Sequence, residues 1–565
     1  MASPAFPEPP AAIPPTPLDE VDRRVARVAS RKDAWVKVDL PRRIELLRRC
    51  LDGVVRVSER WVEGGCKLKG IAPGSVLEGE EWLAGPMTTV RNIRLLIQAL
   101  EAGGRPVPPS ISTRPDGQKV AKVFPTNLQD RAMFTGFTAE VWIQPGKAAS
   151  QGAIYREAPS SGKVSLVLGA GNVSSIPPMD LLYKLFAENE VVVLKMNPVN
   201  AHVGPRLEDA FSSLIEEGFL TIVYGGAEVG AHLAEHPQID TLHVTGSDRT
   251  YDAIVWGADP AEQAQRKKEN RPKNSRPFTA ELGCVTPVLI VPGPWTDDEL
   301  EYQARHVAGM VAQNGSFNCN AAKVIVTAKS WPQREKFLEK VSAALARTPP
   351  RKAYYPGAQH RFQGFLDHYK NAKILGEQGE QIVPWTLLPE VPAKRGEYAL
   401  TNEAFCGVIA EVSLEGDDAR AFLKNAVAFA NDDCWGTLSC CLLIHPTTER
   451  AYADSLDSAV ASLRYGGIGV NVWPGVIYGL CSPTWGAFPG HPPTDIQSGA
   501  GVVHNTFLFD FPEKSVVRAP FVIKPTPLWF PDHKNLADAG RKLVQMEAYP
   551  GWGKLVGVAV AAFKG

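Results

Sequence analysis

Short apolar segments alternate with helical segments between residues 163 and 247, and this alternation limits the possible folds more than any other feature of the sequence. The strand patterns cover residues 164–168, 191–194, 220–223 and 241–244, and the helical patterns cover residues 177–188, 202–217 and 227–235. Strands and helices that alternate at this length predict a parallel sheet with right-handed crossover connections. Ligands of such sheets bind beyond the carboxyl ends of the strands, so we expect an α/β protein with its binding site there.

The rest of the chain adds further helices and a second alternating region. Helices are expected over residues 23–34 and 40–60, and a strand over residues 139–143. The second alternating region predicts strands at 288–291, 323–327, 436–444 and 466–473, and helices at 297–313, 333–345 and 534–546. The Ala- and Pro-rich residues 1–17 predict a disordered leader, because a basic start followed by an apolar core, typical of a secretion signal, is missing.

A polar and basic stretch, residues 266–276, interrupts the alternation. We expect a solvated loop, since that is what most such stretches are. The alternative is that Arg or Lys side chains of this stretch reach the 2′-phosphate of NADP or a phosphate of CoA.

Composition excludes several classes of function. The 565 residues include 60 basic and 61 acidic residues, and this balance gives no long-range attraction to nucleic acid or to an acidic membrane. No run of about 18 or more apolar residues predicts a membrane-spanning helix. The nine cysteines lack a C-x-x-C pair and any metal-ligand spacing, which indicates the reducing cytoplasm and no metal site. A small-molecule partner is therefore expected.

Two residues are candidates for covalent chemistry. Cys319 follows the polar turn 314–316, where exposed N–H groups could lower its pKa and make it a thiolate nucleophile. Glu281 could activate a hydrolytic water if a partly apolar site raises its pKa. The alternatives are an inert buried cysteine and a solvated carboxylate, and neither residue decides the question alone.

Two glycine-containing turns are candidates for cofactor binding. The segment from Gly225 to Gly230 lies at a strand–helix junction, where glycines let the backbone come close to a dinucleotide. Gly246 and Ser247 follow Thr245 at the start of a helix, whose free N–H groups attract phosphate. For Ser247 the simpler interpretation is a helix cap.

Taken in order, eight motifs resemble those of the aldehyde dehydrogenase superfamily. The resemblance covers roughly residues 20–510 and is carried by Asn172, Lys195, Gly225–Gly230, Thr245-Gly246-Ser247, Glu281-Leu282-Gly283, Asn314 to Cys319, Glu403-Ala404-Phe405 and Gly466 to Asn471. Individually the motifs are loose, but their common order and spacing are specific.

The resemblance implies an oxidoreductase that uses NAD or NADP to oxidise a small-molecule aldehyde to an acid. Cys319 would be the nucleophile, Glu281 the general base, and Asn172 an oxyanion donor. Cofactor contacts would come from Lys195, Gly225, Gly246, Ser247, Glu403 and Phe405, with Lys195 and Glu403 on the ribose hydroxyls and Ser247 on the pyrophosphate. A cytoplasmic homodimer or homotetramer that binds neither nucleic acid nor membrane would follow.

The same resemblance implies a Rossmann-type nucleotide-binding domain, an α/β catalytic domain and a β oligomerisation arm. The expected divisions are a leader at 1–17, the nucleotide-binding domain at 18–285 with part of the arm near 136–160, and the catalytic domain at 286–480. Residues 481–520 would return to the nucleotide-binding domain and the arm, and residues 521–565 would form a C-terminal extension.

Several positions depart from the family pattern. Ala170 and Gly171 replace the usual Pro-Trp, which predicts a roomier aldehyde channel, and Pro198 replaces an acidic residue, which makes NADP admissible. Tyr251 is expected near the cofactor path, and Phe317 replaces a Gln before the cysteine. Two other functions stay open: a CoA-dependent acylating dehydrogenase or acyl-CoA reductase, which generally lacks the glutamate, and a catalytically silent scaffold.

Overall fold

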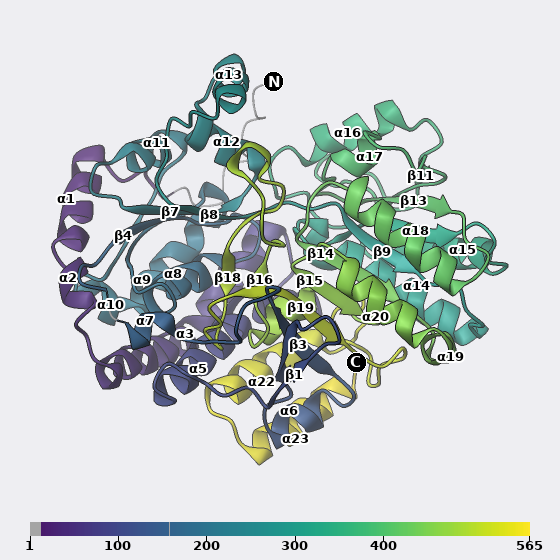
Figure 1. The fold of residues 1–565 in the computed structure, drawn as a ribbon, viewed down its shortest axis with the longest axis horizontal. Coiled ribbons are helices and arrows are strands. Elements are labelled where there is room, and N and C mark those ends of the chain that lie inside the picture. Colours follow the sequence, from purple (N-terminus) through teal and green to yellow (C-terminus); the bar gives the residue numbers. More distant parts are fainter. Residues whose placement is uncertain (1–12, 158) are drawn as a thin grey trace.

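The structure is a computed structural model that describes residues 13–157 and 159–565 (Figure 1). It has two lobes, each built around its own sheet, with the helices of the chain's N- and C-terminal parts packed against them. Residues 1–12 of the predicted leader lie outside the described residues. Residues 13–17, the rest of the predicted leader, lie beside the first sheet. There the Thr16 N–H donates to the Tyr224 carbonyl, and the Tyr224 N–H donates to Thr16 Oγ1.

The first lobe contains a six-stranded sheet with the strand order β17-β8-β7-β4-β5-β6. Its strands are β4 (Val164–Leu168), β5 (Val191–Lys195), β6 (Leu220–Val223), β7 (Thr241–Gly246), β8 (Phe278–Leu282) and the short antiparallel β17 (Gly499–Ala500). All five longer strands are parallel. Every residue of β4 and β5 is buried, as expected for strands covered on both faces by helices.

Helices cover both faces of this sheet. The helices of this lobe are α1 (Leu18–Ala29), α2 (Lys32–Trp35), α3 (Leu40–Lys69), α5 (Thr88–Glu101), α8 (Ile176–Phe186), η2 (Pro198–Val203), α9 (Gly204–Ala210), α10 (Ser212–Glu216), α11 (Ala227–Glu235), α12 (Asp248–Trp256) and the projecting α13 (Pro260–Glu269). Helix α3 runs to Lys69, nine residues beyond the predicted end, and stops at Gly70, whose φ of 64° suits a glycine cap. The predicted helix 202–217 is broken into η2, α9 and α10.

The second lobe contains an eleven-stranded sheet with the order β1-β2-β3-β19-β15-β14-β9-β10-β13-β12-β11. Its strands are β1 (Ser110–Thr113), β2 (Lys119–Phe124), β3 (Thr138–Ile143), β9 (Thr286–Ile290), β10 (Ala322–Ala328), β11 (Lys373–Ile374), β12 (Thr386–Leu388), β13 (Val408–Leu414), β14 (Ser439–Leu443), β15 (Gly467–Val470) and β19 (Pro512–Arg518). The predicted boundary at 285/286 falls between β8 of the first sheet and β9 of the second.

The helices of the second lobe include α14 (Asp297–Ala312), α15 (Arg334–Arg347), α16 (Ala358–His368), α17 (Tyr398–Thr401), α18 (Ala419–Asp432), α19 (Pro446–Ala451), α20 (Ala453–Ser462) and α21 (Gly475–Leu480). Helix α14 starts where the sequence dictates. Thr296 accepts from the Glu299 N–H, and the Glu299 side chain accepts from the Thr296 N–H, so the two residues form a capping box. This helix leads directly into the turn that carries Cys319.

The C-terminal extension folds onto the N-terminal helices at the bottom of Figure 1. Its helices are α22 (Leu536–Ala548) and α23 (Trp552–Ala562), which pack near α4 (Glu78–Trp82), η1 (Leu83–Met87) and α6 (Leu128–Met133). Glu547 of α22 forms a buried ion pair with Arg91 of α5, with 2.6 Å between Arg91 Nη1 and Glu547 Oε1. Throughout residues 13–157 and 159–565, each helix is too short or too polar to cross a bilayer.

The prediction of a loop over residues 266–276 is wrong for the first four residues. Residues 266–269 complete helix α13, which Asp259 caps and Pro260 begins. Arg266, Lys267 and Lys268 lie in its last turn, where positive charge is favourable beside the carbonyl end of a helix. A run of basic residues therefore marked a helix end here.

Candidate active site

A cavity of about 1790 Å³ lies between the two lobes, at the carboxyl ends of strands β4, β5, β7 and β8. Eight of the nine predicted site residues line it: Asn172, Lys195, Gly246, Ser247, Glu281, Cys319, Glu403 and Phe405. The ninth, Gly225, lies behind the wall. Its φ of 139° is one that glycine adopts freely, so it shapes the turn that presents Gly226 and Gly230 to the cavity.

Cys319 and Glu281 meet at the bottom of this cavity. The Cys319 thiol donates a hydrogen bond to Glu281 Oε1 with an Sγ–Oε1 distance of 3.0 Å. Glu281 is the last residue but one of strand β8, and Cys319 follows the turn after helix α14. The Glu281 side chain is buried, and its second oxygen, Oε2, has no hydrogen-bond partner among the described residues. Glu281 therefore keeps hydrogen-bonding capacity beyond its contact with Cys319.

Burial controls the protonation of both groups. It raises the pKa of Glu281 to about 7; the hydrogen bond from Cys319 opposes this shift, and the nearby Asp180 carboxylate adds to it. Burial also raises the pKa of the Cys319 thiol well above its ordinary value. The expectation of a lowered thiol pKa is wrong, since desolvation outweighs the polar turn. Near neutral pH the thiol keeps its proton until a base such as Glu281 takes it.

The turn before Cys319 has an unusual backbone and an extensive set of hydrogen bonds. Asn314, Gly315 and Ser316 have φ values of 55°, 65° and 70°, three left-handed residues in succession. The Asn172 side-chain amide donates to the Phe317 carbonyl at 2.9 Å, and the Asn314 amide donates to the Asn172 and Phe317 carbonyls at 3.3 and 3.2 Å. Asn172 is thus tied to the nucleophile turn, and its amide has a second N–H to donate to a ligand.

Lys323 is a member of this site that the sequence did not reveal. Its Nζ donates to the carbonyls of Asn318, Cys319 and Ala321, each at 3.1 Å. It also pairs with Glu403 Oε1 at 3.1 Å, so the predicted ribose contact Glu403 is joined to the nucleophile turn. The one available signal was a lysine at the start of an apolar strand, where a buried charge needs a partner.

The first lobe's side of the cavity carries the cofactor candidates Lys195, Gly246 and Ser247. Ser247 Oγ accepts from the Thr250 N–H at 3.2 Å, so the helix-cap interpretation is confirmed, and the N-terminus of the nine-residue helix α12 opens on the cavity. Lys195 ends strand β5, and burial lowers its pKa to about 8. A Cβ built on Gly226 or Gly230 would meet nothing within 4 Å, so this part of the wall is open.

Two expectations about departures from the family pattern meet a different outcome. A Cβ on Gly171 would lie 2.7 Å from Asn197 Oδ1, so the Asn197 side chain fills the space expected to widen the channel. Tyr251 is not at the cofactor path: it is buried against the Phe278 ring, with 5.0 Å between centroids.

Most of the basic residues after position 266 already have partners within the protein. Lys267 binds Asp252 and Lys273 binds Glu235, each at 2.7 Å. Arg276 donates to the carbonyls of His236 and Ile239. These pairs leave less charge for a ligand phosphate than the sequence suggested. Within the described ranges, the His, Cys, Asp and Glu side chains form no cluster that could hold a metal ion.

Comparison with known proteins agrees with the fold. Residues 162–360 match the model of the aldehyde dehydrogenase family. A curated relative, 4-trimethylaminobutyraldehyde dehydrogenase A of Danio rerio, is 28% identical over 153 residues. That segment is 26% of this chain and 26% of the relative, so the chain spans about a quarter of the relative's length.

Two solved structures show the same fold over nearly the whole chain. The NADP-dependent glyceraldehyde-3-phosphate dehydrogenase of Bacillus halodurans, complexed with NADP, matches with a TM-score of 0.60 and 16% identity, covering 90% of this chain and 92% of that one. An aldehyde dehydrogenase of Mycobacterium tuberculosis, complexed with NAD+, matches with a TM-score of 0.59 and 16% identity, covering 92% and 95%.

The family model spans the first lobe's sheet and reaches past Cys319, and the structural likeness extends the same architecture to both lobes. Residues 162–360 thus match the aldehyde dehydrogenase family, and the solved structures show the fold of aldehyde dehydrogenases over both lobes.

Proposed function

We propose that the protein oxidises an aldehyde to a carboxylic acid with NAD or NADP, using Cys319 as the nucleophile and Glu281 as the general base. The observation that carries this proposal is the contact of 3.0 Å between the Cys319 thiol and Glu281 inside a cavity of dinucleotide size. A thiol alone would serve other chemistries. A buried carboxylate beside it, with one free oxygen, supplies the base that hydrolysis of a thioester needs.

The cavity fits a nicotinamide dinucleotide on three counts. Its volume exceeds the roughly 300–1,000 Å³ typical of a single small-molecule site, which leaves room for a cofactor and an aldehyde together. The open glycines Gly226 and Gly230 leave space for close approach of a large ligand. The N-terminus of α12 at Ser247 suits a pyrophosphate, and Lys195 suits a ribose hydroxyl. Neither NAD nor NADP is favoured by these residues alone.

The protein's own residues then divide the work as follows. Glu281 accepts the thiol proton, and the Cys319 sulfur bonds to the aldehyde carbon to give a thiohemiacetal. The Asn172 amide and the Cys319 N–H can donate to the oxyanion. The bound nicotinamide supplies the hydride acceptor, and a thioester remains on Cys319. Once Glu281 has given the thiol proton to solvent, it takes a proton from water and the water oxygen bonds to the thioester carbon. The carbon–sulfur bond then breaks to release the acid, and Glu281 returns its proton to the Cys319 sulfur.

We extend the proposal to the setting of the enzyme. All nine cysteines are free thiols, which suits a reducing compartment such as the cytoplasm. Strand β1 is exposed along its whole length at the edge of the second sheet. An open edge of this kind is a natural surface for pairing, and we propose that the arm β1–β3 joins copies of the chain in a homodimer or homotetramer.

The test is the formation of NADH or NADPH, followed by absorbance, over a panel of aldehydes with and without CoA. Turnover without CoA that disappears in Cys319→Ala supports the proposal. Turnover only with CoA would replace it by the acylating reaction. No turnover under any condition, together with a Cys319 thiol that reacts no faster than the buried cysteines, would indicate a silent scaffold.

A further inference from the structure

The turn that presents Cys319 needs an external anchor. Three consecutive residues, Asn314 to Ser316, have left-handed backbone angles, and two of them are not glycine. Such conformations persist only where the surroundings fix them. Ser316 contributes little, because its buried Oγ has no hydrogen-bond partner among the described residues. Beside the hydrogen bonds of the Asn314 side chain, the anchor comes from groups that bind the backbone of the turn itself.

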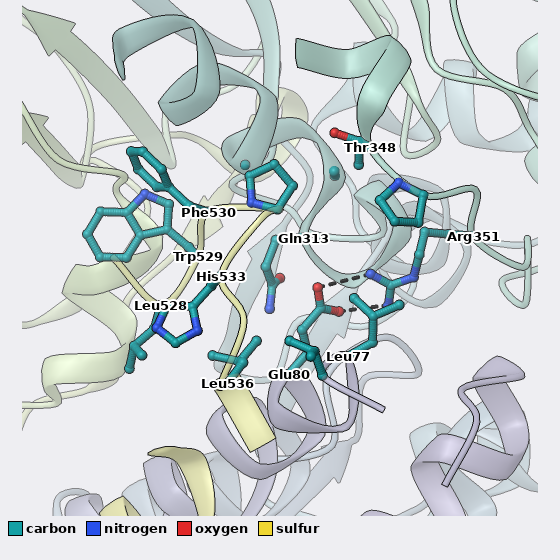
Figure 2. A pocket seen from close by; sticks show the side chains of 15 residues that line it. Leu77, Glu80, Gln313, Thr348, Arg351, Leu528, Trp529, Phe530, His533 and Leu536 are labelled. Atoms are coloured by element: carbon teal, nitrogen blue, oxygen red, sulfur yellow. Dashed lines mark hydrogen bonds and ion pairs between the residues drawn. The ribbon is translucent and has the colours of Figure 1, made fainter. Parts of the chain in front are cut away.

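One such group comes from a helix more than 200 residues earlier in the chain. Glu80 of α4 accepts a hydrogen bond from the Asn314 N–H at 3.1 Å, at the first left-handed residue. Figure 2 shows the Glu80 carboxylate held by Arg351 through two bonds, which measure 2.9 Å from Nη1 to Oε1 and 2.7 Å from Nη2 to Oε2. Both side chains are about nine-tenths buried. A bidentate pair of this kind fixes the carboxylate in direction as well as in position.

The same contact is enclosed by the C-terminal extension. Leu528, Trp529, Phe530, His533 and Leu536 face Glu80, Arg351 and Gln313 around a cavity of about 20 Å³ (Figure 2). This space is close to that of one water molecule, so it is not a ligand site. Its effect is to keep bulk water from Glu80, in surroundings where a charged hydrogen bond is stronger than at the surface.

We propose that Glu80, clamped by Arg351, is a positioning residue that holds the left-handed turn in place and thereby keeps the Cys319 thiol against Glu281. The chain of contacts runs from Glu80 to the Asn314 N–H, from the Asn314 side chain to Asn172 and Phe317, and from there to Cys319 two residues on. This inference rests on the proposed role of Cys319 and adds a residue to it that touches neither substrate nor cofactor.

The decisive variant is Glu80→Leu/Arg351→Met, which removes the anchor without leaving an unpaired buried charge. The readout is the rate of Cys319 alkylation by iodoacetamide against pH, located by peptide mass spectrometry. In the wild type we expect an inflection near pH 7, where Glu281 becomes able to take the thiol proton. In the double variant the inflection should disappear, the rate should follow an ordinary thiol, and kcat should fall at least about tenfold.

Two further variants separate positioning from stability. Glu80→Gln/Arg351→Met restores an uncharged acceptor for the Asn314 N–H and should recover the inflection and most of kcat. Glu547→Gln breaks another buried ion pair, with Arg91, and should lower the melting temperature while leaving the alkylation profile unchanged. If Glu80→Leu/Arg351→Met does not fold, Glu80→Asp keeps the charge but withdraws the acceptor by one methylene, and it should weaken the inflection.

The outcomes are distinguishable from a failure of the proposed function. A wild type without an inflection and without turnover contradicts the Cys319–Glu281 chemistry itself. A wild type that shows both, beside an unchanged profile in the folded Glu80→Leu/Arg351→Met or Glu80→Asp variant, overturns the role of Glu80. An equal loss of the inflection in Glu547→Gln would also overturn it, since general destabilisation would then explain the effect.

Discussion

The two walls of the central cavity are built in different ways. On the cofactor wall, each residue is placed by its own neighbours: Ser247 caps the helix that begins at the next residue, and Lys195 ends a strand. On the nucleophile wall, Cys319 lies in a turn that is held by the nearby Lys323 and also by Glu80 and Asn172, which lie 234 and 142 residues from Asn314 in the chain. A locally built wall tolerates single changes, whereas a wall built from distant contacts depends on each of them.

The largest effect is expected at the centre of the nucleophile wall. Cys319→Ala removes the only thiol in contact with Glu281 among the described residues, and kcat for aldehyde oxidation should fall by at least about 10⁴-fold. Cofactor affinity should stay within about threefold, because the opposite wall is untouched. Steady-state kinetics and cofactor titration by fluorescence measure the two quantities. Substantial residual turnover would show that another group carries the chemistry.

A second effect on the same wall concerns stability. Because the folded-state pKa of Glu281 is raised to about 7, its protonated form stabilises the folded protein below about pH 4.5, and this contribution is lost as pH rises through about 7. The Glu281→Gln side chain does not titrate, so the variant does not lose this contribution as the pH rises. From pH 5 to pH 8.5 the variant should gain on the order of 3 kcal/mol in unfolding free energy relative to the wild type. Denaturant unfolding at both pH values checks this, and a constant difference would contradict it.

On the cofactor wall the expected effects are smaller. Lys195→Met should raise the Kd of NAD or NADP by about 10- to 100-fold, the range for losing one hydrogen bond from a charged group. The alkylation profile of Cys319 should not change. Isothermal titration calorimetry gives the Kd. An unchanged Kd would show that Lys195 does not bind the cofactor. A changed pH profile of Cys319 alkylation would show that the two walls are not independent.

The smallest effect is expected at the helix cap. Ser247→Ala removes the acceptor of the Thr250 N–H and should lower stability by about 1 kcal/mol. Since Lys195 and the open glycines on the same wall are proposed to bind the cofactor as well, the KM for the cofactor should rise only a few fold. Thermal unfolding and initial-rate kinetics measure both. A loss of activity as large as that of Cys319→Ala would mean that the cofactor wall is not locally built.

The same contrast explains what could be predicted from the sequence. Strands β4 and β6 and helix α11 lie where their patterns placed them, because apolar runs, glycines and caps act over a few residues. The ordered motifs brought Cys319 and Glu281 together as candidates, although 38 residues separate them. Glu80, Lys323 and Arg351 were not found. Each reads as an ordinary charged residue, and only folding shows that it is buried beside the nucleophile turn.

Errors arose where a local pattern met a tertiary constraint. The basic stretch after residue 265 was expected as a loop, but its charges complement the end of α13. The polar turn before Cys319 predicted a lowered pKa for the thiol, but the thiol is buried in the folded protein, and burial raises its pKa. In both cases the sequence pointed to the right residues, but the folded surroundings decided what those residues do.

The most direct test of the Cys319–Glu281 chemistry is intact-protein mass spectrometry of Glu281→Gln after mixing with an oxidisable aldehyde and NAD or NADP. Without the base, the thioester should form more slowly than in the wild type, but once formed it should fail to hydrolyse and so accumulate over a long incubation. The variant should therefore gain the mass of one acyl group, which peptide mapping places on Cys319 and which Cys319→Ala abolishes. An acyl group on another residue, or release of acid by Glu281→Gln at the wild-type rate, would contradict the account.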